Sequence, residues 1–334
     1  MLILRHDSSL RHDTGGHPES VARIAAILGA LEARHWLGAE VRDSSPVAME
    51  TLCAVHPEPY VDFIRGACEG GGGYLDADTV VSSGSWEAAL HSAGGAVELV
   101  DELVGGSVRA GASLHRPPGH HAEAAQAMGF CLFANVAVAC QHAIDAHGLE
   151  RIFVLDFDVH HGNGTNDIFH ADPRVLFVSL HQRPLYPGTG RADDRGSGDG
   201  LGYTVNLPLP PGSGDEAWCS MVEHVAIPLA RAYEPQLVLL SAGFDAHARD
   251  PLANCEVSDQ GYALMAGSAR RLADESGCGL GVVLEGGYDL DALVGGLLAV
   301  LEVAGASEAP AAPSDLAVHP LAADARERWD LAPA

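Results

Sequence analysis

Short apolar runs alternate along the chain with longer stretches rich in Ala and Leu. The short runs have the length of buried strands and cover 106–114, 151–158, 174–181, 236–242 and 280–285. The longer stretches have the length of helices and cover 19–34, 84–104, 133–147, 215–233, 259–276 and 290–304. This alternation predicts βαβ units. We therefore expect an α/β fold of the doubly wound type, with a mostly parallel sheet flanked by helices and functional residues at the carboxyl ends of the strands.

The 334 residues suit one large α/β domain, so we expect a single domain over 1–334. The stretches 69–84 and 183–214 are rich in Gly, Pro, Ser and Asp and are too long for ordinary connections. They predict functional loops over the edge of the sheet. From about residue 306 the chain is rich in Ala and Pro, and we expect 306–334 to form a peripheral tail.

The charge balance narrows the possible partners. The formal net charge is −26, and all 19 basic residues are arginine because the chain contains no lysine. A nucleic-acid partner needs a basic face, so we expect none. An acidic surface favours a cationic substrate or partner, but it also simply keeps a protein soluble, and the sequence leaves both interpretations open.

The cysteine content and the hydropathy of the chain indicate in which cellular compartment we expect the protein. The seven cysteines form no Cys-x-x-Cys pair, their number is odd, and no secretory signal begins the chain. We therefore expect a reduced, cytoplasmic protein. No run of about 18 apolar residues occurs, so we expect no membrane partner. A homo-oligomer is compatible with the sequence, which leaves the oligomeric state open.

The segment 151–165 carries the most informative pattern. It begins as an apolar strand and continues with Asp156, Asp158 and His160, at positions i, i+2 and i+4. In an extended strand these positions share one face, so the pattern predicts a metal site at the carboxyl edge of the sheet. The alternative is a polar loop whose carboxylates cap the next helix.

Three other predicted strands also lead into residues that could take part in metal binding or catalysis. One leads into 115–121, which ends in two histidines, one into Asp245, and one into Tyr288. In a doubly wound sheet these ends meet at one crevice. Asp158, His160 and Asp245 would then form a set of three ligands with an open position, which suits catalytic Zn²⁺ but would also accept Fe²⁺ or Mn²⁺. Taken alone, Asp245 is equally well explained as a helix N-cap.

The tandem histidines suit acid–base work near such a metal. His120 and His121 follow two prolines and a glycine, and histidine can both accept and return a proton at neutral pH. Each imidazole needs an orienting partner, and Asp156 and Asn163 are available. Tyr288 could donate a hydrogen bond to a developing oxyanion. The alternatives are that one histidine merely packs and that Tyr288 is a packed loop aromatic.

Taken together, these segments resemble the histone deacetylase family of the arginase-like fold, in particular its class II and bacterial amidohydrolase branch. The resemblance covers about residues 12–300. The matching motifs occur in the family's order: 17–24 (HPESVARI), 116–123 (RPPGHHAE), 129–131 (GFC), 155–165 (LDFDVHHGNGT), 178–181 (VSLH), 186–190 (YPGTG), 241–245 (SAGFD) and 285–288 (EGGY).

The resemblance implies a role for each catalytic position. It implies that the catalytic Zn²⁺ is held by Asp158, His160 and Asp245. It implies that His121 is the general base and then the acid, and that Asn163 orients it; class II relatives have Asn at this position. His120 would be a second, mainly electrostatic histidine paired with Asp156, and Tyr288 would stabilise the oxyanion.

The resemblance also implies a substrate tunnel. Gly129, Phe130 and Tyr186 would form its narrow walls, where many relatives have Phe in place of Tyr186. Asp78 would lie near the substrate backbone. Leu252 would stand at the tunnel mouth, where Glu accompanies polyamine specificity in the family, so its apolar side chain favours acylated lysine.

Structural potassium is a further implication. The resemblance places an inner K⁺ site at Asp156, Asp158, His160, Ser179 and Leu180, and an outer one at Phe169, Asp172, Val175 and Tyr203. It aligns Arg23 with an arginine near the exit for product acetate.

The predicted activity is hydrolysis of acylated lysine, in a peptide or protein, or of a related acylated alkyl amine. The acidic charge keeps an acetylpolyamine or other small-molecule deacetylase open as the alternative. A binuclear Mn²⁺ ureohydrolase would need a second set of bridging carboxylates, and a non-enzymatic binding module would be expected to lack a ligand or the tyrosine.

Overall fold

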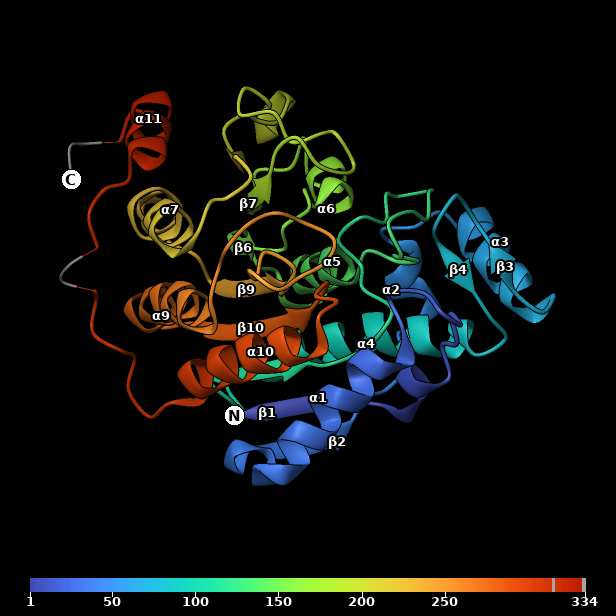
Figure 1. The fold of residues 1–334 in the computed structure, drawn as a ribbon. Coiled ribbons are helices and arrows are strands. Elements are labelled where there is room, and N and C mark those ends of the chain that lie inside the picture. The colour runs from blue at the N-terminus through green and yellow to red at the C-terminus, as the bar shows by residue number, and fades with distance from the viewer. Residues whose placement is uncertain (314–315, 332–334) are drawn as a thin grey trace.

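The structure, a computed structural model, describes residues 1–313 and 316–331. Eight strands form one parallel sheet in the order β2-β1-β5-β10-β9-β6-β7-β8 (Figure 1). Their bounds are β1 Leu2–Arg5, β2 Glu40–Asp43, β5 Ala110–Ser113, β6 Ile152–Asp156, β7 Val175–Gln182, β8 Thr204–Leu209, β9 Leu237–Ala242 and β10 Gly279–Leu284. The sheet confirms the predicted α/β architecture.

The strands predicted from apolar runs are all present, but the sheet extends further at both edges. β1 has only four residues, and β2 reads Glu-Val-Arg-Asp and is partly exposed, so neither produces an apolar run long enough to recognise. β8 lies inside 183–214, so the expectation of a loop is wrong for Thr204–Leu209. Asn206 and Pro208 interrupt its hydrophobic pattern, which is tolerated because β8 is an edge strand.

Helices follow the predicted segments closely. The expected helices are α1 Val21–Ala33, α4 Ser85–Val104, α5 Asn135–His147, α9 Asp259–Ser276 and α10 Leu290–Gly305. The stretch 215–233 is continuous but changes pitch, with α7 Asp215–Met221, a π-helical turn Val222–Ala226 and α8 Ile227–Tyr233. Shorter helices that we did not predict are α2 Met49–Cys53, α3 Glu58–Glu69, α6 Asn163–Ile168 and α11 Pro320–Arg328.

Two apolar cores lie on opposite faces of the sheet. Successive strand residues point to opposite faces, and alternate residues of β6 accordingly belong to different cores. Phe153 and Leu155 pack in the core covered by α1 and α7 to α10. Ile152 and Val154 pack in the core under α4 and α5. Burial on both faces explains why the central strands read as uninterrupted apolar runs.

The peripheral segments differ in how firmly they pack. In 69–84, β3 Gly73–Tyr74 and β4 Val80–Val81 form a small antiparallel hairpin, which lies with α3 on one side of the molecule (Figure 1). The tail is less peripheral than expected, because Ala322 and Ala325 of its helix α11, and Trp329 directly after that helix, belong to the larger core. Residues 314–315 and 332–334 of that tail lie outside the described residues. No described helix is long and apolar enough to cross a membrane.

Candidate active site

The predicted site residues converge at the carboxyl ends of β5, β10, β9 and β6, which are neighbours in the sheet. One local expectation is wrong. We predicted that Asp156, Asp158 and His160 share a strand face, but β6 ends at Asp156, and the next two residues of the set follow in a tight turn. Backbone N–H groups hold that turn, since Asp158 N donates to Asp156 Oδ1 at 3.1 Å and His160 N donates to Asp158 Oδ1 at 2.9 Å.

Asp158, His160 and Asp245 form a buried cluster whose potential ligand atoms all lie within 4.8 Å of one another. His160 Nδ1 is 3.1 Å from both Asp158 Oδ1 and Asp245 Oδ2. Two carboxylates and one imidazole match a catalytic zinc site, in which a fourth position stays open for substrate. The geometry therefore fits the predicted metal ligands.

The electrostatics of the cluster also favour a bound cation. Burial, followed by the neighbouring Asp158 carboxylate, raises the pKa of Asp245. Burial also opposes ionisation of Asp158, but His120 and His160 outweigh it and lower the pKa of that carboxyl. Two buried acids in contact with one histidine leave excess negative charge, which a divalent ion would balance.

Two glycines shape the pocket around these carboxylates. A Cβ atom on Gly243 would lie 2.0 Å from Asp158 Oδ2, and one on Gly286 would lie 2.4 Å from Asp245 Oδ2. Any side chain at either position would displace a ligand. Gly286 N also donates to Asp158 Oδ2 at 2.9 Å. Both glycines belong to motifs named above, SAGFD and EGGY.

The environment of His121 defines its tautomer. Asn163 Nδ2 donates to Glu123 Oε1 at 3.0 Å, so its carbonyl oxygen faces His121 Nδ1 at 2.8 Å. The proton of a neutral imidazole then resides on Nδ1, leaving the lone pair of Nε2 free to accept a proton. Burial, then His120 and His160, lowers the pKa of His121 well below its usual value, which keeps the ring neutral. The sequence did not indicate that Glu123 orients Asn163.

His120 has the opposite electrostatic character. Its Nδ1 lies 3.1 Å from Asp156 Oδ2, as predicted for this pair. Although burial opposes protonation, Asp158 and Asp156 raise the pKa of His120 well above its usual value. The buried Glu285 accepts hydrogen bonds from Gly119 N at 2.6 Å and His120 N at 3.1 Å, and thereby holds the histidine loop in place. The role of Glu285 depends on these tertiary contacts, so the motif EGGY alone did not reveal it.

Aromatic rings surround His121. Tyr186 packs edge-on against His121 with ring centroids 5.2 Å apart, and Phe130 packs edge-on against Tyr288 at 5.7 Å. Gly129 has a φ of +53°, and a Cβ there would lie 2.4 Å from the His121 ring, so glycine is required beside His121. These contacts bring together the residues predicted as tunnel walls. Tyr186 stays 39% exposed, as a residue at an entrance would be.

Leu252 is connected to the tyrosine through Asp250. Asp250 Oδ1 accepts a hydrogen bond from Leu252 N at 3.0 Å, and Oδ2 accepts one from Tyr288 N at 2.6 Å. The backbone positions of Leu252 and Tyr288 are therefore coupled. Asp78 lies in the loop of the β3–β4 hairpin, and its neighbour Thr79 accepts a hydrogen bond from Phe130 N at 3.2 Å.

Two buried arginines, Arg23 and Arg116, support the backbone around the site. Arg23 is fully buried and donates to Gly287 O and Glu285 O, at 2.6 Å each, and its guanidinium carbon lies 5.0 Å from the centre of the Tyr288 ring. Glu19 contacts both Arg23, at 3.1 Å, and Arg116, at 2.5 Å. Burial opposes its ionisation, but Arg116 and His12 lower the pKa of Glu19 far below the usual value.

The residues predicted for potassium occupy two separate places. Asp156 and Ser179 are paired across β6 and β7, next to the turn that carries Asp158 and His160, with Leu180 following in β7. In the second place Asp172 N donates to Phe169 O at 3.0 Å, while the Asp172 carboxylate binds Arg174. Val175 begins β7, and Tyr203 O accepts the Phe177 N–H at 2.9 Å. Potassium at either place stays a prediction.

The comparisons with known proteins agree with this arrangement. A family model described as a histone deacetylase domain matches residues 17–304. The chain is 41% identical over 312 residues to histone deacetylase 14, chloroplastic, of Arabidopsis thaliana, covering 87% of this chain and 74% of that protein. It is 40% identical over 275 residues to the histone deacetylase-like amidohydrolase of Pseudomonas aeruginosa, covering 81% and 71%.

Structure comparison gives the same family. The crystal structure of the HDA15 HD domain superposes with a TM-score of 0.90 at 35% sequence identity, covering 98% of this chain and 95% of that one. Similarity of this extent in sequence and in fold confirms the resemblance that the motifs indicated. The chain belongs to the histone deacetylase family.

Proposed function

We propose that this protein is a Zn²⁺-dependent amidohydrolase that removes acetyl or other acyl groups from the side chains of acylated lysine. The carrying observation is the cluster of Asp158, His160 and Asp245. The neutral His121 lies beside it, and Tyr288 follows two residues after Gly286, whose N–H donates to Asp158 Oδ2. Family membership supports the reaction class. The geometry and charge of the cluster support the metal.

The ligand cluster and the nearby side chains would have separate roles in the reaction. Zn²⁺ held by Asp158, His160 and Asp245 would supply Lewis-acid chemistry, polarising the amide carbonyl and lowering the pKa of a water molecule. His121 Nε2 takes the proton from the attacking water, because Asn163 holds the proton of Nδ1. His121 then returns a proton to the amine nitrogen, which leaves as the free amine.

His120 and Tyr288 complete the charge balance. The pair of His120 and Asp156 places a buried positive charge beside His121 and limits how strongly that base holds a proton. The Tyr288 hydroxyl donates a hydrogen bond to the carbonyl oxygen as negative charge develops there. Burial raises the pKa of Tyr288 well above its usual value, so the phenol keeps the proton it needs to donate.

The entrance favours an extended acyl-lysine chain. Phe130 and Tyr186 offer flat apolar faces to a methylene chain, and Leu252 adds an apolar group nearby. We propose a cytoplasmic location on the basis of the free cysteines, although relatives include proteins named as chloroplastic. Structural K⁺ at the two places described above is part of the same proposal.

Substitution of Tyr288 tests the mechanism. We expect Tyr288→Phe to lower kcat/KM for an acetyl-lysine peptide by about 10²-fold, because one oxyanion donor is lost. Zinc content, measured by mass spectrometry, should stay at the wild-type level. Deacetylation at the wild-type rate by the variant would contradict the assigned role.

The alternative substrate is an acetylpolyamine, favoured by the net charge of −26. A comparison of kcat/KM for an acetyl-lysine peptide and for acetylspermidine separates the two, with chelator-treated protein as the blank. We expect the peptide to be preferred, and the preference to shrink in Leu252→Glu. A wild-type preference for acetylspermidine would replace the proposed substrate but leave the reaction class unchanged.

A further inference from the structure

A second group of metal-binding side chains lies on the surface between α4 and α5, at the end of these helices away from the catalytic site. It consists of Asp101, near the end of α4, and His142 and His147, in the last part of α5. From Asn135, at the catalytic end of α5, to His147 the helix rises about 18 Å. The group is therefore separate from the catalytic cluster.

The two histidines converge on one oxygen atom. His142 Nε2 and His147 Nε2 each lie 2.7 Å from Asp101 Oδ1. Their rings are nearly perpendicular, at 82°, with centroids 5.6 Å apart, so the nitrogen atoms approach the carboxylate from different directions. Once the Nε2 protons that point at the carboxylate leave or move to Nδ1, two imidazoles and one carboxylate would offer the convergent lone pairs that a tetrahedral transition-metal site requires.

We propose that Asp101, His142 and His147 bind a divalent transition-metal ion such as Zn²⁺, with water completing the coordination. Bonds of 2.0–2.1 Å in a tetrahedron place ligand atoms roughly 3.3 Å apart. The atoms would therefore separate by about 0.6 Å from their 2.7 Å hydrogen-bonding distance on binding. The Asp101 side chain is 49% exposed and has the freedom for this movement. The histidines, at 17% and 26% exposed, are more buried than Asp101, and their rings contact each other.

A bound ion would link α4 and α5, the two helices that support the loop carrying His120 and His121. Leu99 and Val100 of α4 pack with Ala139 and Ala143 of α5 in one core. At the opposite end of the pair, the first residue of α5, Asn135, donates to Ser92 Oγ of α4 and to Pro117 O of the histidine loop, at 3.1 and 3.2 Å. Binding would stabilise this helix pair without adding a group to the catalytic site.

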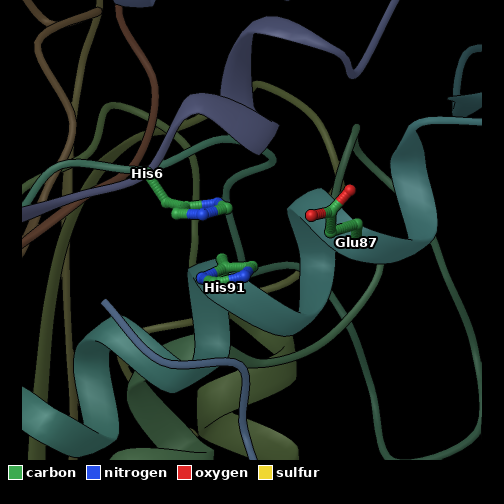
Figure 2. Close-up of side chains that lie close together, drawn as sticks. All are labelled: His6, Glu87 and His91. Atoms are coloured by element: carbon green, nitrogen blue, oxygen red, sulfur yellow. The ribbon is translucent and has the colours of Figure 1, made fainter. Parts of the chain in front are cut away.

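A second cluster with two histidines shows why the ligand atoms must point toward one position. Figure 2 shows His6 and His91 face to face, with Glu87 to one side. Their rings are 3.5 Å apart and tilted by only 7°, so the in-plane lone pairs run in parallel planes and do not meet. The Glu87 carboxylate is already bound by Arg11 at 2.7 Å. We therefore assign no ion to His6, Glu87 and His91.

Zinc stoichiometry tests the proposal. The full chain is dialysed against buffered micromolar Zn²⁺ at pH 7.5, and bound zinc is counted by mass spectrometry. We expect two equivalents for wild type, and one for His142→Ala or Asp101→Asn. His170→Ala is the matched control, because His170 forms a single histidine–carboxylate pair with Asp194 at 2.8 Å, and it should retain both equivalents. His6→Ala should also retain both.

The two sites are distinguished by which variant loses an ion. Asp158→Asn should lose the catalytic equivalent and keep the second, whereas His142→Ala should do the opposite. Zn²⁺ should also raise the Tm of Asp158→Asn more than that of the double variant with His142→Ala. A single wild-type equivalent that Asp158→Asn abolishes, or two equivalents retained by His142→Ala, would overturn the second site. A single wild-type equivalent that only His142→Ala abolishes would support the second site and contradict the catalytic zinc.

Discussion

At the scale of single residues, buried histidines divide into two electrostatic kinds. His120 pairs with Asp156 and lies near Asp158, and these carboxylates overcome the effect of burial and raise its pKa well above the ordinary value. No carboxylate in the described part of the chain pairs with His56, and burial lowers its pKa to about 4. Its Nδ1 donates to Ala124 O at 2.9 Å and its Nε2 accepts from Ala134 N at 2.9 Å, an arrangement possible only for the neutral ring.

His56 should therefore make folding sensitive to acid. Its folded pKa of about 4 lies below the ordinary value of 6.5, so the unfolded chain binds the proton more tightly. Its contribution is complete above pH 6.5 and declines as the pH falls towards 4, by about 2 kcal/mol between pH 7.5 and 5.0. The free energy of unfolding from urea titrations at these two pH values measures it.

The comparison variant is His56→Gln, which retains a donor and an acceptor but cannot titrate. It should be less stable than wild type at pH 7.5, yet lose about 2 kcal/mol less on going to pH 5.0. The exposed His35→Gln controls for removal of an imidazole elsewhere. Equal pH dependence in wild type and His56→Gln would rule out this source of acid sensitivity.

At the scale of elements, the central strands could be predicted because burial on both faces leaves an apolar run. β1 and β2 could not, because a four-residue strand and a polar edge strand carry no such signal. Asp158, His160 and Asp245, predicted as metal ligands, and His121, predicted as the base, lie in motifs that are recognisable in the sequence. Glu123, Glu285 and Asp250 act through contacts with residues far away in sequence, and only the folded chain shows those contacts.

The turn after β10 allows a test of how tightly the backbone must pack against the predicted metal ligands. We expect Gly286→Ala to weaken zinc binding by about 10–100-fold, because its Cβ would lie 2.4 Å from Asp245 Oδ2 and 2.5 Å from Asp158 Oδ2. Competition with a chelator of known affinity measures the effect. Near-ultraviolet circular dichroism should show that the fold is retained.

Gly29→Ala is the matched control for adding one methyl group. Gly29 lies in the exposed part of α1 with nothing within 4 Å of the added Cβ. Zinc affinity should be unchanged, and the helix should become more stable by about 0.5–1 kcal/mol. If Gly286→Ala binds zinc as tightly as Gly29→Ala does, the carboxylates can move freely and the close fit has no role.

At the scale of the whole molecule, the surplus of acids is the dominant property. The net charge is −26, and several of the 19 basic residues are already paired, such as Arg42 with Glu102 and Arg231 with Glu275. Near the entrance, Asp76 and Asp78 add local negative charge, and burial raises the pKa of Asp78. Such a surface attracts cationic substrates over a range set by salt.

Substrate steering should therefore depend on ionic strength. We compare kcat/KM for two acetyl-lysine peptides that differ only in having Arg or Glu at flanking positions. The Arg peptide should be preferred, and its advantage should fall several-fold between 20 and 500 mM NaCl, because the screening length drops from roughly 20 to 4 Å. Asp76→Asn should reduce the advantage only slightly if the whole charge of −26 acts together, and strongly if the entrance dominates. A preference that does not change with salt would mean that the acidic surface maintains solubility and does not steer the substrate.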